Sequence, residues 1–128
     1  MTAICSNLDM EQYHQLSDAT METLLASLEE LLDSLGRPSY EVEYHSGVLT
    51  LILGDKGTYV INKQPPNRQI WLSSPFSGPK RYDYSEEADA WVYSREDRSM
   101  GHLLNDELSQ VLERDVDVRI TKISDFAQ

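Results

Sequence analysis

The sequence predicts an α+β fold, a two-layer sandwich with two helices packed on one face of a mainly antiparallel sheet of about 5–7 strands. A long amphipathic segment opens the chain, short runs with alternating apolar residues follow, and a second amphipathic segment comes near the end. Successive strands joined by short turns pair antiparallel, and helices before and after them can cover one face. The order of segments therefore predicts an antiparallel sheet covered on one side by both helices.

Size and charge limit the kind of protein this is. The chain has 128 residues, 40% of them hydrophobic, which is enough for one core. We expect a flexible N-terminus at residues 1–8, a single domain at 9–123 and a short tail at 124–128. The formal charge of −11 argues against nucleic acid or an anionic membrane as partner and favours cations or basic protein surfaces. Cys5 is the only cysteine, so neither an internal disulfide nor a thiolate metal site can form.

The first helix is predicted from its end signals. Asp9 can cap the N-terminus, and Gln12 follows at the spacing of a capping box. Gly36, two residues before Pro38, supplies the left-handed position at which helices commonly end. At about 100° per residue, one broad apolar face is formed by Tyr13, Leu16, Met21, Leu24, Leu28, Leu31, Leu32 and Leu35.

The remaining elements follow in order. Alternation and turn residues predict strands at Tyr40–His45, Val48–Leu53, 58–61, 70–72 and 90–94. Residues 84–89 are predicted to form an acidic loop, and residues 100–113 a second amphipathic helix. Alternation over residues 116–123 predicts a short final strand. No apolar run approaches the length of a membrane span.

The strands at 58–61 and 70–72 predict an unusual outward face. If Ile61, Ile70 and Leu72 point into the core, Trp71 points outward among carboxamide side chains. An indole ringed by polar groups is a common composition for a binding patch. The alternative is a register shifted by one residue, which would bury Trp71 and turn the core residues outward.

Negative charge is concentrated in the first part of the chain. Residues 9–55 hold ten acidic residues and one basic residue, Arg37, whereas the rest holds twelve acidic and ten basic residues. Helical spacing gathers Glu11, Asp18, Glu22, Glu29 and Asp33 on one edge, with Glu30 beside them. Carboxylates suit hard cations such as Mg²⁺, Ca²⁺, Mn²⁺ and Fe²⁺, but exposed ones on a helix bind each ion weakly. The alternative interpretation is a solvated face that only keeps the protein soluble.

The chain resembles the frataxin family over roughly residues 8–120. The matching motifs are GTYVINKQ at 57–64, Pro66-Asn67, QIWLSSP at 69–75, SGPKRYD at 77–83, WVYS at 91–94 and SGVLT at 46–50. The resemblance implies the same sandwich fold and a mitochondrial matrix protein whose targeting segment is absent from this chain. It also implies weak, surface-bound iron (Fe²⁺/Fe³⁺) on the first helix and first strand. The candidate metal residues are Asp18, Glu22, Glu29, Glu30, Asp33, Glu41, Glu43 and Asp55, with His14 added because helical spacing places it near them.

The family likeness also implies partners. They are a cysteine desulfurase and its iron–sulfur scaffold protein, whose sulfur transfer frataxin activates, with a role as iron chaperone. The positions that match the partner-binding surface are Asn62, Gln64, Asn67, Gln69, Trp71 and Arg81. A monomer is expected, with an iron-dependent oligomer as the alternative.

The chemistry of the chain leaves the enzyme question open. No nucleophile elbow, phosphate-binding glycine loop or HExxH motif is present. The second hypothesis is a ferroxidase that oxidises Fe²⁺ to Fe³⁺ and stores the product in oligomers, with Glu29 and Asp33 as its carboxylate pair. The sequence lacks the buried Glu/His di-iron constellation of an efficient oxidase. A third hypothesis is a binding domain whose acidity serves solubility alone.

Overall fold

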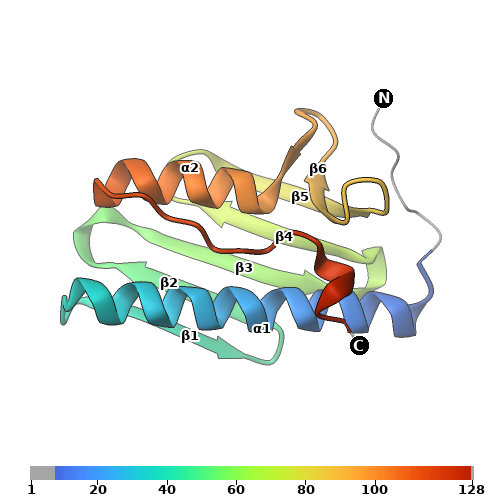
Figure 1. Cartoon of the computed structure of the whole chain (residues 1–128), viewed down its shortest axis with the longest axis horizontal. Helices are drawn as coiled ribbons and strands as arrows, with labels where there is room; N and C mark the ends of the chain where they lie inside the picture. The colour runs from blue at the N-terminus through green and yellow to red at the C-terminus, as the bar shows by residue number, and fades with distance from the viewer. Residues whose placement is uncertain (1–7, 128) are drawn as a thin grey trace.

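Seven strands form one antiparallel sheet, and both helices lie against the same face of it (Figure 1). The structure is a computed structural model that describes residues 8–127. Strand order in the sheet follows chain order from first to last, so every connection joins neighbours. Short turns between strands enforce this order, because a two- to four-residue connection leaves no room for a crossover. The predicted α+β sandwich is confirmed.

Helix α1 (Met10–Leu35) begins and ends where its cap residues predict. The Gln12 amide donates to Asp9 Oδ1 at 2.7 Å, and the Asp9 amide donates to Gln12 Oε1 at 3.2 Å. Gly36 takes the left-handed conformation with φ 61°, and its N–H bonds to the Leu32 carbonyl. Both ends therefore satisfy part of the unpaired backbone at a helix terminus.

The buried face of α1 is more polar than the apolar periodicity predicts. Tyr13, Met21, Leu24 and Leu28 are fully buried as expected, while Leu16, Leu31 and Leu32 are only partly buried. The centre of the face instead includes Ser17, Thr20 and Ser27. Small hydroxyl residues bring neighbouring segments close to the helix, and burial is tolerated because each hydroxyl finds a hydrogen-bond partner.

The strands alternate between buried and exposed side chains. Their bounds are β1 Tyr40–His45, β2 Val48–Leu53, β3 Thr58–Gln64, β4 Gln69–Ser74, β5 Gly78–Ser85, β6 Ala90–Tyr93 and β7 Arg98–Ser99. The short helix η1 (Gly54–Lys56) joins β2 to β3, and η2 (Pro65–Asn67) joins β3 to β4. The predicted loop at 84–89 is wrong at its start, because Tyr84 and Ser85 belong to β5. Tyr84 is buried there with its ring 5.7 Å from that of Trp91, and this packing extends the strand.

Helix α2 (Met100–Leu112) covers the other half of the sheet. Ser99 caps it, with the His102 amide donating to Ser99 Oγ at 3.0 Å. Leu103, Leu104 and Leu108 are buried, as the periodicity predicts.

The predicted strand at 116–123 is wrong. This segment runs between α1 and α2 without regular structure as far as Lys122 and pairs with no strand, and Ile123 begins the short helix η3 (Ile123–Asp125) (Figure 1). Side chains of the helices satisfy its backbone instead: Val118 N–H donates to Asn105 Oδ1 at 2.7 Å, and Ser27 Oγ donates to the Val118 carbonyl at 2.8 Å. The alternation of apolar residues still predicts burial correctly, because Val118 and Ile120 are buried between the helices.

The C-terminal end is fastened to the β5–β6 loop by Asp89. The amide and hydroxyl of Ser124 both donate to the Asp89 carboxylate, at 3.0 and 2.6 Å, and the Tyr84 hydroxyl donates to it as well. Burial raises the pKa of Asp89, but these hydrogen bonds outweigh burial and hold the pKa below its usual value. The expected N-terminal segment lies outside the described residues except for Leu8, which is buried. The expected tail at 124–128 begins with the bonded Ser124.

Candidate functional site

Trp71 lies on the sheet face opposite the helices. Its partners in register are Asn62 on β3 and Arg81 on β5, so the three side chains form one row across three strands. Ile61, Ile70 and Leu72 are at most 1% exposed on the helix side. The predicted register is therefore confirmed, and the alternative with a buried Trp71 is wrong.

Neighbouring polar groups fix the indole in place. Trp71 Nε1 donates to Gln69 Oε1 at 2.8 Å, and the Arg81 guanidinium carbon lies 4.5 Å from the centre of the indole ring. Gln69 Nε2 in turn donates to Asp83 Oδ1 at 3.1 Å. A guanidinium over an indole is a favourable cation–π arrangement. Trp71 is thus held half-exposed in one orientation.

We call this surface the open face, and it gathers the predicted partner-binding residues. Gln64 pairs with Gln69 across β3 and β4, and Asn62 Nδ2 donates to Gln64 Oε1 at 3.4 Å. Asn67 is exposed on η2, at the end of the same hairpin. Beside Trp71 lies a shallow hollow of about 360 Å³, with Val60 and Pro79 among its lining residues. Sequence reasoning did not identify this hollow, although the alternation along β3 places Val60 on the same face as Asn62.

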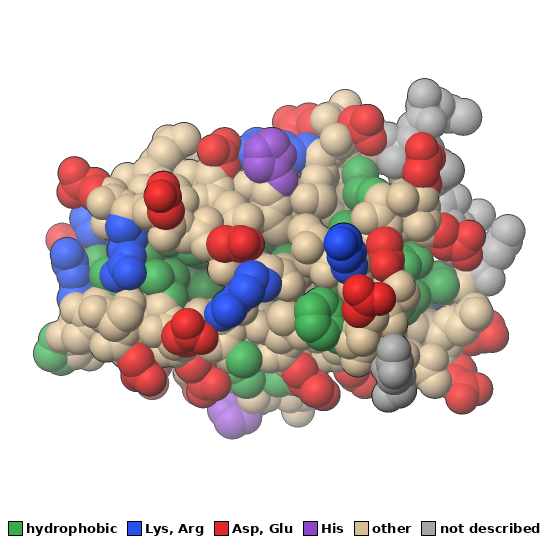
Figure 2. Space-filling view, in the orientation of Figure 1, with side chains coloured by type: hydrophobic (Ala, Val, Ile, Leu, Met, Phe, Trp, Pro, Cys, Tyr) green, Lys and Arg blue, Asp and Glu red, His purple; other side chains and the backbone are tan. Residues whose placement is uncertain are grey.

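The predicted acidic edge is shared by α1 and β1. Glu22, Glu29 and Asp33 are exposed on the helix, and Glu41 and Glu43 are exposed on the strand. Figure 2 shows acidic side chains along the edge of the molecule where these two elements lie. Asp55 is exposed on η1, beyond the start of β1.

Tyr44 shows that the carboxylates of α1 act on the neighbouring strand β1. It lies on β1 directly after the exposed Glu43, and burial raises its pKa. The negative charges of Asp18 and Glu22 raise that pKa further. The field of the α1 carboxylates therefore reaches β1, where Glu41 and Glu43 are exposed.

Two carboxylates of the edge are paired with bases that lie outside residues 9–55, the part of the chain in which Arg37 is the only base. Asp18 Oδ1 lies 2.5 Å from Lys63 Nζ, and Glu30 Oε2 lies 3.1 Å from Arg119 Nη2. These bases come from β3 and from the C-terminal segment, so helical spacing alone could not reveal them. Strand alternation could have shown that Lys63 faces the helices, because it lies two residues after the buried Ile61 on β3.

The candidate metal residues do not gather into one multidentate site. Among residues 8–127, no three side chains of the His, Cys, Asp and Glu types lie close enough together to hold a metal ion. His14 is placed at the start of the edge, with its Nδ1 3.0 Å from Lys63 Nζ. His45 is paired with Glu43 at 3.4 Å on the surface.

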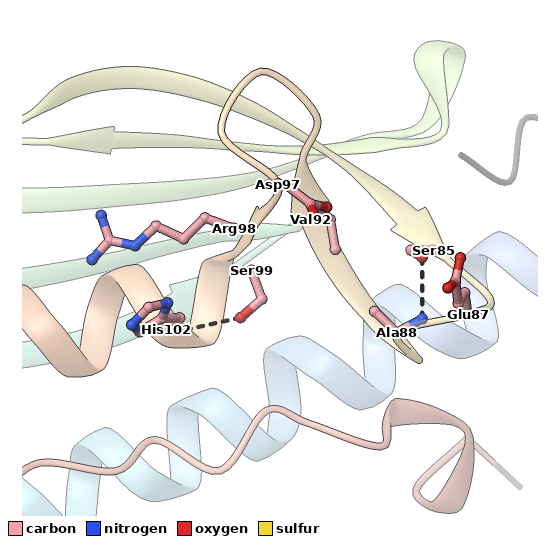
Figure 3. A pocket seen from close by; sticks show the side chains of 8 residues that line it. All are labelled: Ser85, Glu87, Ala88, Val92, Asp97, Arg98, Ser99 and His102. Carbon is pink, nitrogen blue, oxygen red and sulfur yellow. Dashed lines mark hydrogen bonds between the residues drawn. The ribbon is translucent and has the colours of Figure 1, made fainter. Parts of the chain in front are cut away.

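A separate polar pocket of about 580 Å³ lies near the start of α2 (Figure 3). No predicted site residue lines it. Its serines are engaged in local structure, since Ser99 Oγ caps α2 and Ser85 Oγ accepts from the Ala88 amide at 3.2 Å. Arg98, on its rim, pairs with Asp106 at 2.6 Å.

These features define a class: a small two-layer α+β domain with one open sheet face around a fixed tryptophan and an acidic edge on its first helix. The Frataxin-like domain family model matches residues 6–114 of the chain. The chain belongs to the frataxin family, and the resemblance in its strand motifs is confirmed.

Relatives and solved structures agree with this assignment. The chain is 44% identical over 115 residues to the mitochondrial frataxin homologue of Schizosaccharomyces pombe, covering 90% of this chain and 72% of that one. It is 44% identical over 106 residues to mitochondrial frataxin of Arabidopsis thaliana, covering 83% of this chain and 57% of that one. The solved structure of yeast frataxin superposes with a TM-score of 0.71 at 43% identity, covering 84% of this chain and 85% of that one.

A second yeast structure bears on metal binding. It is a trimeric frataxin complexed with ferrous iron, with a TM-score of 0.66 and 42% identity, covering 77% of this chain and 87% of that one. The names of the relatives place them in mitochondria, in agreement with the expected location. Within residues 8–127, no helix combines the length and apolar character needed to cross a bilayer.

Proposed function

We propose that this chain is an iron-binding regulator of mitochondrial iron–sulfur cluster assembly. It activates sulfur transfer by a cysteine desulfurase bound to its scaffold protein. Family membership supports the general role, and the open face supports the mode of action. The single observation that carries the proposal is Trp71, fixed half-exposed at the centre of the helix-free face.

The open face suits a protein that changes the shape of a partner. The indole is held rigidly, so it can insert beside a mobile loop without itself losing much conformational freedom. Asn62 and the exposed Asn67 offer amide donors and acceptors for the backbone of that loop. Such contacts stabilise one of the partner's conformations, which accelerates its reaction without covalent chemistry in this chain.

The acidic edge contributes weak iron binding and docking. Exposed carboxylates that do not surround an ion leave it largely hydrated, so bound iron exchanges quickly. The same charges attract basic surfaces of a desulfurase and raise the association rate. The ferrous complex of a yeast relative supports iron as the metal.

Activation is tested with a purified desulfurase–scaffold mixture and a measurement of sulfide or cluster formation. Adding the chain is expected to raise the rate, and Trp71→Ala or Asn62→Ala is expected to remove most of that increase. Thr58→Ala is the matched control, because Thr58 is exposed on the same face at the far end of β3. If both variants activate as well as the parent chain, the open face is not the working surface.

An iron-dependent oligomer with ferroxidase activity is the second candidate, supported by the trimeric form of the yeast relative. Glu29 and Asp33, one turn apart on α1, would bind the Fe²⁺ that is oxidised. Oxygen uptake with Fe²⁺ tests this idea, with sedimentation to follow assembly. The candidate predicts turnover that is lost in the Glu29→Gln/Asp33→Asn variant, and absence of turnover in the parent chain eliminates it.

A further inference from the structure

Lys63 lies in an unusual place for a lysine. It lies two residues after the buried Ile61 on β3, so its side chain points to the same helix side of the sheet and is only 10% exposed. Its ammonium lies 2.5 Å from Asp18 Oδ1, 3.0 Å from His14 Nδ1 and 5.7 Å from the centre of the Tyr13 ring. Side chains from two neighbouring turns of α1 therefore surround one cation.

The chemistry of these contacts defines the state of His14. An ammonium group has donors and no acceptor, so His14 Nδ1 must accept the hydrogen bond and carry no proton. His14 and Asp18 are one turn apart on α1, which places an imidazole nitrogen and a carboxylate oxygen on the same side. These are the donor types that a divalent transition metal uses.

We infer that Lys63 is an internal cation that occupies the site formed by His14 and Asp18 and keeps metal ions out of it. This inference rests on the proposed metal-binding edge and refines it. Metal ions bound by the folded chain then go to the carboxylates further along α1, from Glu29 onward. His14 and Asp18 bind metal only where the lysine is absent.

Tethering makes Lys63 an effective competitor. A group attached to the same fold is present at high effective concentration, and a metal ion must displace it before reaching both ligands. The displaced ammonium would remain in a largely buried position without its carboxylate partner, which is unfavourable.

The second ion pair of the acidic edge shows the contrast. Arg119 and Glu30 have side chains that are 56% and 74% exposed. Solvent and salt screen such a pair, and Arg119 can move into water at little cost. Glu30 therefore stays available to metal, whereas Asp18 does not.

Co²⁺ is the probe for the test, because it binds imidazole and carboxylate ligands and broadens nearby nuclear magnetic resonance signals. In the parent chain, Co²⁺ is expected to broaden amide signals near Glu29 and leave those of His14 and Asp18 sharp. In Lys63→Met, the signals of His14 and Asp18 are expected to disappear, and calorimetry should show one additional bound Co²⁺.

Three further variants isolate the cause. Lys56→Met removes the same charge from an exposed lysine and should leave the His14 signals sharp. Lys63→Arg keeps a cation in place and should do the same. Lys63→Met/His14→Ala should lose the additional Co²⁺, and circular dichroism checks that each variant is folded.

The inference is overturned if Co²⁺ broadens His14 and Asp18 equally in the parent chain and in Lys63→Met. It is also overturned if folded Lys63→Met gains no Co²⁺ at these residues. If the proposed iron-binding edge is wrong, the result is different, because Co²⁺ then broadens no signals near Glu29 in the parent chain. Co²⁺ binding at His14 in Lys63→Met still decides the role of the lysine in that case.

Discussion

The hydroxyl of Tyr13 joins the first helix to the hairpin that carries the open face, and removing it gives a sharp test of the structure. The hydroxyl donates to the Gln69 carbonyl at 2.8 Å and accepts from the Gln64 amide at 3.0 Å. Burial raises the pKa of Tyr13 to about 12, so the group is a neutral donor at physiological pH. Tyr13→Phe removes both hydrogen bonds and little else.

The expected loss follows from those two contacts. Phenylalanine keeps the edge-on packing against Trp91 and the ring surface below Lys63. Each lost hydrogen bond costs about 1 kcal/mol net, and a buried amide left without a partner costs about 1–3 kcal/mol. We expect a decrease of about 2 kcal/mol in the free energy of unfolding. For a domain of this size that is a lower melting temperature by roughly 6–10 °C.

Urea unfolding followed by circular dichroism measures this change, and hydrogen exchange should show faster exchange at the Gln64 amide. Tyr40→Phe is the matched control, because the Tyr40 hydroxyl accepts only an exposed, 3.3 Å hydrogen bond from Arg37. The control should lie within about 0.5 kcal/mol of the parent chain. A loss for Tyr13→Phe no larger than that of the control would refute the proposed link.

Three more substitutions test the packing around the helices. Asp89→Asn should be less stable than the parent chain at pH 7. Because the folded-state pKa of Asp89 is lowered, the difference in the free energy of unfolding should be complete above the ordinary value of 3.8 and should shrink as the pH falls below it. Urea unfolding at several pH values measures this difference. Thr20→Val leaves the buried Trp91 Nε1 without the acceptor it has at 2.8 Å and should cost about 1–3 kcal/mol in the same assay. Gly101→Ala places a methyl group 3.0 Å from Ile120 Cγ1. The resulting overpacking costs about 1–3 kcal/mol and should exceed the gain in helix propensity of about 1 kcal/mol, so the melting temperature should fall.

Local signals predicted most of the fold. The capping box at Asp9 and the glycine stop at Gly36 act within a few residues, so the sequence contains all the information that fixes α1. Alternation likewise predicted which side chains are buried in the strands that it identified, but it identified neither β5 nor β7. It could not distinguish a strand from an extended segment, because residues 116–123 alternate in the same way but obtain their hydrogen bonds from the distant Asn105 and Ser27.

In the candidate site, too, local features could be predicted from the sequence and contacts between distant residues could not. The open face could be predicted because Trp71 and Gln69 are two residues apart on one strand, and strand geometry alone puts them together. The stacking of Arg81 on Trp71 depends on the pairing of β4 with β5. The pairing of Asp18 with Lys63 joins residues 45 positions apart, and only the packing of α1 on β3 creates it.

That packing also means that the acidic edge and the open face are not independent surfaces. Lys63 contacts Asp18 on the helix side, and its neighbour Asn62 points to the open face from the same strand. Tyr13 adds a second link, through the backbone of Gln64. We therefore expect a change in the cation held by α1 to act on the strand that carries Asn62. Lys63→Met should be assayed for desulfurase activation as well as for Co²⁺, because both surfaces share β3.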